Sequence, residues 1–292
     1  MEILSHSEWK QKVVDHNQRV LPYVEEFRGR RACRKRHPVN DFLFTYYSHR
    51  PGQLLRWSPG IGFGLEVKGD DSRIGSHFKL ENKICSLDFN LMTDRKKKEL
   101  LWIHNLMKLT STRSGIFKCF GLHEWAMVYR ASLSDIRHEK YPLRMTLDQV
   151  NGFLNSQKLC CSHYDAFRFF TTEARSMNNL ELGIDDRMKY EQPACLHTNM
   201  DLYKWSYKLS PWMASEVVVD AFLLALEIRQ LDMRASPYDL RSLGYEPIRI
   251  ETASGREEYE SLQRDFSLKA KPIRQRILNS TEEIIKYLEI NV

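Results

Sequence analysis

The sequence has no long hydrophobic run. Its longest apolar stretch, around Val217 to Leu226, is interrupted by Asp220 and is much shorter than the ~20 residues that span a bilayer. The first ten residues, MEILSHSEWK, also lack the basic start and apolar core of a signal peptide. We therefore expect no transmembrane helix, no membrane partner and no export.

Cysteine is scarce and irregularly spaced. No two cysteines form a C-x-x-C pair, and the six are spread over most of the chain: Cys33, Cys85, Cys119, Cys160, Cys161 and Cys195. This distribution is typical of free thiols in a reducing compartment, and it excludes a disulfide framework. The sequence therefore predicts a cytoplasmic protein.

The signatures of several large enzyme classes are also absent. The sequence contains no P-loop, no dinucleotide-binding glycine motif, no G-x-S-x-G element and no cysteine-based catalytic motif. It has no internal repeat or low-complexity segment either, which excludes a solenoid. No single local motif therefore identifies the reaction of this protein.

The composition is that of a globular chain. Of its 292 residues, 42% are hydrophobic and 28% are charged, and a chain of this length buries a sizeable core without disulfides or metals. Apolar residues recur at helical spacing in several segments, of which residues 215–233 form the most apolar. We expect a mainly α protein formed by one helical domain over residues 1–292.

One segment has a different texture. Residues from about 60 to 92 are rich in glycine and contain alternating apolar positions, a pattern that predicts a small β-sheet or hairpin inserted in the helical domain. A further strand is expected at residues 246–251, and an α+β architecture is the alternative. A long amphipathic helix is expected from Arg256 onward, interrupted at Pro272.

Basic residues are concentrated at one place. The net charge is +6, and residues 28–36 carry six basic side chains and no acidic one. Such a patch is able to contact the phosphates of a nucleic acid. The alternative is a solvated loop between two helices. The candidate contacts are Arg30, Arg31, Arg34, Lys35 and Arg36.

Three helix-prone segments each combine a histidine with a carboxylate among apolar residues. They contain His123 and Glu124, His163 and Asp165, and His197 and Asp201. Charged groups rarely enter apolar faces unless they are paired, bind a metal or act in catalysis. If the segments converge, His123, His163 and His197 are candidate ligands of a divalent iron, manganese or zinc ion. The alternative is that these histidines lie in the core and hydrogen-bond to neighbouring carboxylates.

Aromatic and arginine side chains accompany these segments. Flat rings can stack on a nucleobase, and arginine can bind a phosphate or carboxylate through two hydrogen bonds. Aromatics at helical spacing can equally be plain core residues, and an arginine can form a buried pair with an aspartate. The candidate substrate-binding residues are Tyr46, Tyr47, Trp125, Arg168, Trp205 and Arg234.

Five strings of the sequence carry a resemblance to a known family. They are HPVNDFLFTYYSHRP from His37, FGLHEWAMVYR from Phe120, SHYDAFRFFT from Ser162, CLHTNMDLYK from Cys195 and LDMRASPYDL from Leu231. With these strings the chain resembles a bacterial family labelled 3-methyladenine DNA glycosylase, and the resemblance covers most of the chain.

The resemblance implies a hydrolase of DNA repair that acts on a modified base in DNA or RNA. Such an enzyme needs a carboxylate that activates water and an aromatic pocket for the base, and Glu124, Asp165 or Asp201 is the candidate general base. Two other hypotheses stay open. One is a metal-dependent helical enzyme of oxygenase type with His and Asp or Glu ligands, and the other is a non-enzymatic module that binds RNA or a protein.

Overall fold

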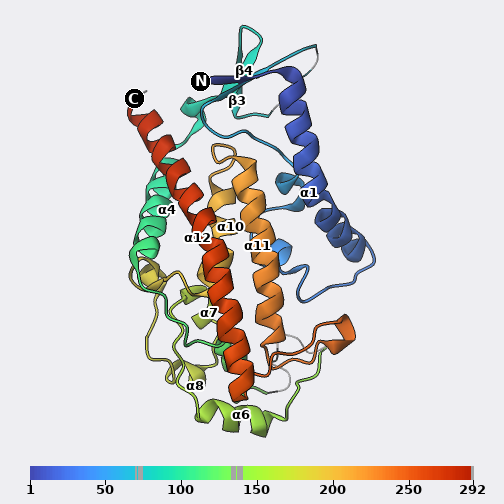
Figure 1. The fold of residues 1–292 in the computed structure, drawn as a ribbon, viewed down its shortest axis with the longest axis vertical. Coiled ribbons are helices and arrows are strands. Elements are labelled where there is room, and N and C mark those ends of the chain that lie inside the picture. The colour runs from blue at the N-terminus through green and yellow to red at the C-terminus, as the bar shows by residue number, and fades with distance from the viewer. Residues whose placement is uncertain (70, 72–74, 133–135, 137–140, 291–292) are drawn as a thin grey trace. The chain divides into compact units, whose positions relative to one another are not determined.

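The computed structural model describes residues 1–69, 71, 75–132, 136 and 141–290. Helices make up most of this part of the chain, and four short strands form one sheet (Figure 1). The prediction of a mainly α protein with a small sheet is confirmed. Three of the four strands lie within the predicted β-containing segment, residues 60–92.

The chain divides into two compact units. Unit 1 comprises Met1–Lys108, Leu202–Leu223 and Pro272–Val292, and unit 2 comprises Leu109–Asp201 and Leu224–Lys271. Four helices contribute residues to both units: α4 (Asp94–Thr112), α10 (Leu196–Lys208), α11 (Ser215–Arg234) and α12 (Ala253–Ile290).

Unit 1 contains the sheet. Its strands are β1 (Glu2–Leu4), β2 (Phe63–Glu66), β3 (Phe78–Glu81) and β4 (Ile84–Leu87), in the order β1-β2-β4-β3. The β1 strand is parallel to β2, and the other neighbours are antiparallel. One face of the sheet buries Leu4, Leu65 and Cys85 against Trp9, so the sheet has a small apolar core of its own.

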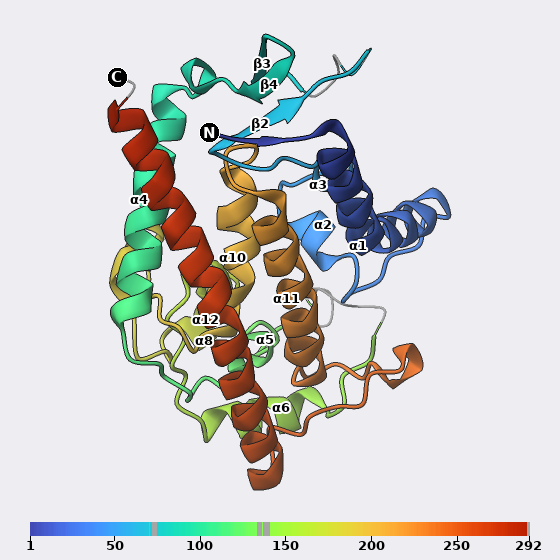
Figure 2. The ribbon, with the colours of Figure 1, turned by 45° about the horizontal axis from the view of Figure 1, so that its top comes forward.

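The first helix of unit 1, α1 (His6–Ala32), begins at a capping box formed by Ser5 and Glu8 and runs through Pro22. The other helical elements of this unit are α2 (Phe42–Tyr46), α3 (Pro51–Leu54), the 3-10 turn η1 (Phe89–Leu91) and most of α4 (Asp94–Thr112). The C-terminal part of α12 lies beside α4 (Figures 1 and 2), and His104 Nδ1 is 3.1 Å from Thr281 Oγ1.

Unit 2 consists mainly of short helices joined by irregular segments. They are α5 (Leu122–Ala126), α6 (Leu147–Asn155), α7 (Tyr164–Phe167), α8 (Thr172–Arg175) and α9 (Arg187–Tyr190), with 3-10 turns η3 (Ile184–Asp186) and η4 (Arg241–Leu243). Thr146 and Gln149 form the capping box that the sequence predicts at the start of α6.

Two local predictions are wrong. Residues 246–251 form no strand, because the amide of Ile248 donates to the carbonyl of Arg234 at the end of α11 instead of to a neighbouring strand. The second error concerns Pro272, which lies inside α12 without ending the helix.

In the described residues, no helix is both long and apolar enough to cross a membrane.

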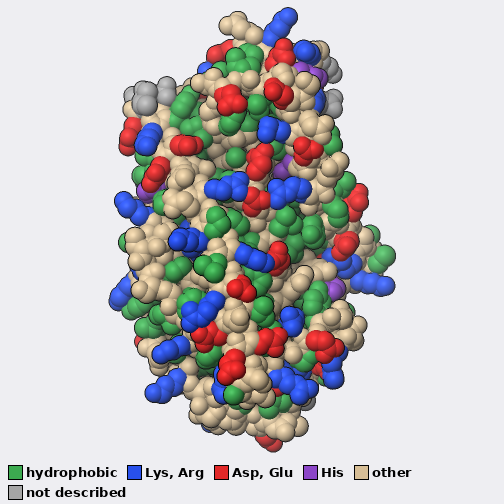
Figure 3. Space-filling view, viewed as in Figure 1, with side chains coloured by type: hydrophobic (Ala, Val, Ile, Leu, Met, Phe, Trp, Pro, Cys, Tyr) green, Lys and Arg blue, Asp and Glu red, His purple; other side chains and the backbone are tan. Residues whose placement is uncertain are grey.

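On the face drawn in Figure 3, lysine and arginine side chains are interspersed with aspartate and glutamate.

Candidate metal centre

The three predicted histidines come together in unit 2. His123 lies on α5, His163 immediately precedes α7, and His197 lies in the first turn of α10. The ring centroids of His123 and His197 are 4.3 Å apart, and those of His163 and His197 are 5.4 Å apart. The three segments that carry a histidine and a carboxylate therefore converge.

A sharp turn positions His123. Phe120 and Gly121 have positive φ angles of 45° and 69°, a backbone conformation that favours glycine. A Cβ atom at Gly121 would lie 3.2 Å from the ring of Tyr259, so this glycine also permits close packing. The chain then enters α5, whose five residues are all buried.

His123, His197 and Asp232 form a first triad, in which each residue offers a ligand atom within 4.8 Å of the other two. His123 Nε2 lies 2.9 Å from Asp232 Oδ1. Neither atom has a hydrogen-bond partner of suitable geometry among the described residues. A ring nitrogen and a carboxylate oxygen this close together are an arrangement that a shared cation would also satisfy.

An arginine and a second carboxylate border the first triad. The buried Arg229 lies 2.6 Å from Asp232 Oδ2 and 2.8 Å from Glu124 Oε1. Burial lowers the pKa of His123, but the charge of Asp232 outweighs this effect and raises it overall. For Asp232 burial acts upward, and the nearby charges of His123 and Arg229 hold the pKa well below its usual range. Burial lowers the pKa of His197 to about 3, so this imidazole is neutral at physiological pH.

His163, Glu191 and Asp201 form a second triad, with ligand atoms also within 4.8 Å of one another. His163 Nε2 lies 3.4 Å from Asp201 Oδ2 and 3.6 Å from Glu191 Oε1, and all three side chains are almost completely buried. Arg187 borders this triad: it lies 2.7 Å from Asp165 and approaches Asp201 and Glu191 at 3.7 and 3.8 Å.

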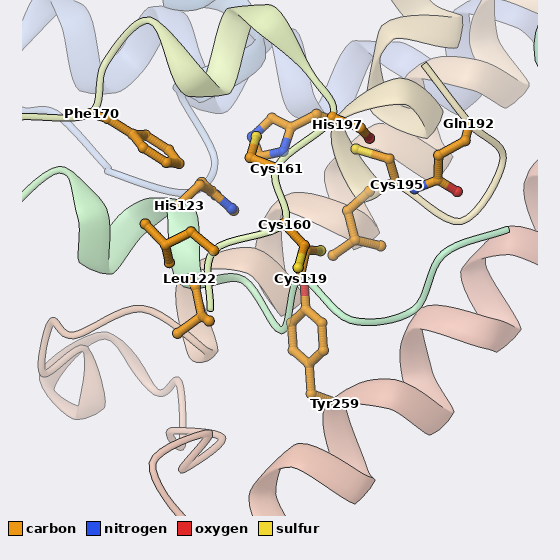
Figure 4. Close-up of a pocket in the computed structure, with 13 residues that line it drawn as sticks. Cys119, Leu122, His123, Cys160, Cys161, Phe170, Gln192, Cys195, His197 and Tyr259 are labelled. Carbon is orange, nitrogen blue, oxygen red and sulfur yellow. The ribbon is translucent and has the colours of Figure 1, made fainter. Parts of the chain in front are cut away.

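The first triad borders a pocket of unit 2. His123 from α5, His197 from α10 and Tyr259 from α12 line it, as Figure 4 shows. The free space is about 20 Å³, which holds roughly one water molecule. Four cysteines also line the pocket: Cys119, Cys160, Cys161 and Cys195.

Three of these cysteines, Cys119, Cys161 and Cys195, are poor nucleophiles because burial opposes the loss of the thiol proton. Burial raises the pKa of Cys161 to about 12 and also raises those of Cys119 and Cys195. A thiol in this state is mostly protonated at neutral pH, whereas the nucleophile is the thiolate. Cys119, Cys161 and Cys195 therefore do not offer nucleophilic catalysis in this state.

The three candidate general bases have different surroundings. Glu124 and Asp165 each lie within 2.8 Å of an arginine, Arg229 and Arg187 respectively. Asp201 belongs to the second triad, although its partner at i−4, His197, belongs to the first. The i, i+4 spacing on α10 thus places one ligand candidate in each triad.

The substrate-binding candidates of unit 2 are Trp125, Arg168 and Arg234. Trp125 is fully buried and donates its indole N–H to the carbonyl of Ala235. Arg168 is 3.5 Å from Asp165, and Arg234 donates to the carbonyl of Glu246. Ligand binding by these three residues stays a prediction.

The remaining candidates belong to unit 1. Tyr46 stacks on Phe42, Tyr47 is buried, and Trp205 packs against Trp102. In the basic run, Arg30 pairs with Glu26 and Asp41. The other four candidate phosphate contacts, Arg31, Arg34, Lys35 and Arg36, are exposed.

Arg187, Glu191 and Arg229 were not among the residues predicted from the sequence, and Asp232 was not among the predicted ligands. Arg229 and Asp232 gave a signal, because they are charged residues in the most apolar helix of the chain. Glu191 lies in a polar segment before α10 and had no such signal. Its burial results from the tertiary fold alone.

The comparisons with known proteins give no relative: no family model, no curated protein and no solved structure matches this chain.

Proposed function

We propose that this protein is a metal-dependent enzyme of the non-haem iron oxygenase type, with the ion held by His123, His197 and Asp232. The observation that carries the proposal is the convergence of two imidazoles and one carboxylate within 4.8 Å of one another beside a pocket. This ligand set is typical of non-haem iron oxygenases, because it leaves coordination positions open for other ligands. Manganese and zinc also suit these donors.

The groups around the triad support this assignment. The guanidinium of Arg229 lies 2.6 Å from Oδ2 of Asp232, while Oδ1 of the same carboxylate faces His123. A partner that fixes the second oxygen of a carboxylate orients the first one toward a metal. Arg229 therefore acts as a positioning residue for Asp232.

The pocket fits a small co-substrate. Its free space of about 20 Å³ lies against His123 and His197, and it admits water or a molecule of similar size such as dioxygen. A nucleobase or any larger substrate requires the lining side chains to move.

The first test is the metal content of untagged protein purified without chelator under anaerobic conditions. We expect iron in the wild type and a loss of at least about tenfold in His197→Ala and Asp232→Asn, since ligands contribute more than the second-shell residues whose loss weakens binding 10–100-fold. His16→Asn is the matched control, because His16 is buried in unit 1 and contacts a backbone carbonyl, that of Leu54. Metal-free wild-type protein that also fails to take up added Fe²⁺ would overturn the proposal.

A second test examines the open coordination positions. Nitric oxide is a surrogate for dioxygen, and we expect it to bind the Fe²⁺-loaded wild type with the paramagnetic signal of an iron–nitrosyl complex. Asp232→Asn should not give this signal. Zinc as the resident metal would instead indicate a hydrolytic enzyme.

The glycosylase-like hydrolase implied by the resemblance is the second candidate and stays a prediction. Its candidate bases Glu124 and Asp165 are close to arginines, and the pocket is smaller than a base. Release of a modified base from alkylated DNA by chelator-treated protein would favour it, provided that Glu124→Gln, Asp165→Asn or Asp201→Asn abolishes the release. The non-enzymatic RNA- or protein-binding module also stays a prediction. Histidine–carboxylate pairs scattered in space would have favoured it.

A further inference from the structure

We infer that His163, Glu191 and Asp201 hold a second metal ion, so that the centre is dinuclear. The inference rests on the proposed function, which places the first ion at His123, His197 and Asp232. Nothing in the local sequence pattern names this second ligand set, because its three members come from three different segments of unit 2.

The surroundings of His163 support a second ion. This side chain is only 1% exposed, yet neither ring nitrogen has a hydrogen-bond partner among the described residues. A buried imidazole normally satisfies both nitrogens. Its Nε2 instead faces carboxylate oxygens of Asp201 and Glu191 at 3.4 and 3.6 Å, which are separations found between ligands of one ion.

The carboxylates near Arg187 also support a second ion. Three buried carboxylates, Asp165, Glu191 and Asp201, surround the single buried guanidinium of Arg187. Arg168 also faces Asp165 at 3.5 Å, but its side chain is 44% exposed and its charge is screened by water. A divalent cation suits the donors that His163, Glu191 and Asp201 bring together.

His197 lies between the histidines of the two triads. Its ring lies 4.3 Å from that of His123 in the first triad and 5.4 Å from that of His163 in the second. A ligand candidate of the first triad therefore lies next to a ligand candidate of the second, so ions held by the two ligand sets would be neighbours. None of His163, Glu191 and Asp201 lines the pocket. The ligands of the second ion, rich in carboxylates, suit iron or manganese.

The experiment counts ions. Chelator-treated wild-type protein is loaded with Mn²⁺ under anaerobic conditions, freed of unbound metal by gel filtration and analysed by mass spectrometry. We expect about two ions per chain in the wild type and about one in Asp201→Asn and in Glu191→Gln. Asp41→Asn is the matched control, because Asp41 is a buried carboxylate that pairs with an arginine in unit 1. It should retain both ions.

The outcomes separate the two proposals. No bound ion in the wild type contradicts the proposed function and the dinuclear centre together. One ion per chain in the wild type, or two that persist in Asp201→Asn and Glu191→Gln, overturns the dinuclear centre. A single ion that is lost in Asp232→Asn and retained in Asp201→Asn leaves the first site intact.

An independent measurement does not depend on the folding of any variant. Two Mn²⁺ ions a few ångströms apart are magnetically coupled, so the electron paramagnetic resonance spectrum of the loaded wild type should be that of a coupled pair. The spectrum of an isolated Mn²⁺ ion in fully loaded wild-type protein would overturn the inference.

Discussion

His49 should make unit 1 sensitive to acid. This histidine is 7% exposed, stacks on Tyr207 with ring centroids 4.5 Å apart and lies 3.1 Å from the hydroxyl of Tyr203. Burial lowers the pKa of His49 from 6.5 to about 4. The unfolded chain therefore takes up a proton at a higher pH than the folded chain does, so the free energy of unfolding falls as the pH falls below 6.5.

The pKa shift sets the size of the effect. Linkage gives a loss of about 2 kcal/mol between about pH 7.5 and pH 5, and of about 3 kcal/mol once the pH is below 4. In His49→Asn this contribution is absent, because asparagine does not titrate. Urea unfolding of both proteins at about pH 7.5 and pH 5 measures the difference. Equal losses of unfolding free energy in the wild type and in His49→Asn would refute the reasoning.

Two further predictions concern charged residues. Arg229→Met should lower the free energy of unfolding of metal-free protein by about 3–5 kcal/mol, because it leaves Glu124 and Asp232 buried without their cation. The exposed pair of Arg264 and Glu260 is the control, since Arg264→Met should lower the free energy of unfolding by at most about 1 kcal/mol. Urea unfolding measures both variants, and equal losses of unfolding free energy would contradict the role of Arg229 as the buried partner of the two carboxylates. If the basic run binds DNA, alanine at the exposed Arg31, Arg34, Lys35 and Arg36 should lower the slope of log affinity against log salt by about 0.9 for each lost phosphate contact. Fluorescence anisotropy of labelled duplex DNA at several salt concentrations measures this slope, and an unchanged slope would exclude the run as the interface.

Local sequence patterns gave most of the secondary structure. Helical spacing predicted the long helices α11 and α12, and the capping box of Thr146 and Gln149 marked the start of α6. The same local reasoning failed at residues 246–251 and at Pro272. At residues 246–251, a hydrogen bond to the end of α11 outweighs the local preference for a strand. At Pro272, the continuity of α12 outweighs the local preference of proline to end a helix.

The candidate site was only partly visible in the sequence. A histidine or carboxylate among apolar residues is costly to bury without a partner, and this rule singled out His123, His163, His197 and Asp201 from local context alone. It could not say which carboxylate belongs to which histidine, because that depends on distances between segments far apart in the chain.

The sequence by itself determined a helical protein with a small sheet and with histidines and carboxylates in apolar surroundings, since these properties follow from the spacing and chemistry of neighbouring residues. Only the tertiary structure decided that the histidines converge, that Asp232 and Glu191 join them, and that Glu124 and Asp165 pair with arginines. The physical reason is that burial and charge pairing arise when distant segments pack together, and no local pattern encodes the partner.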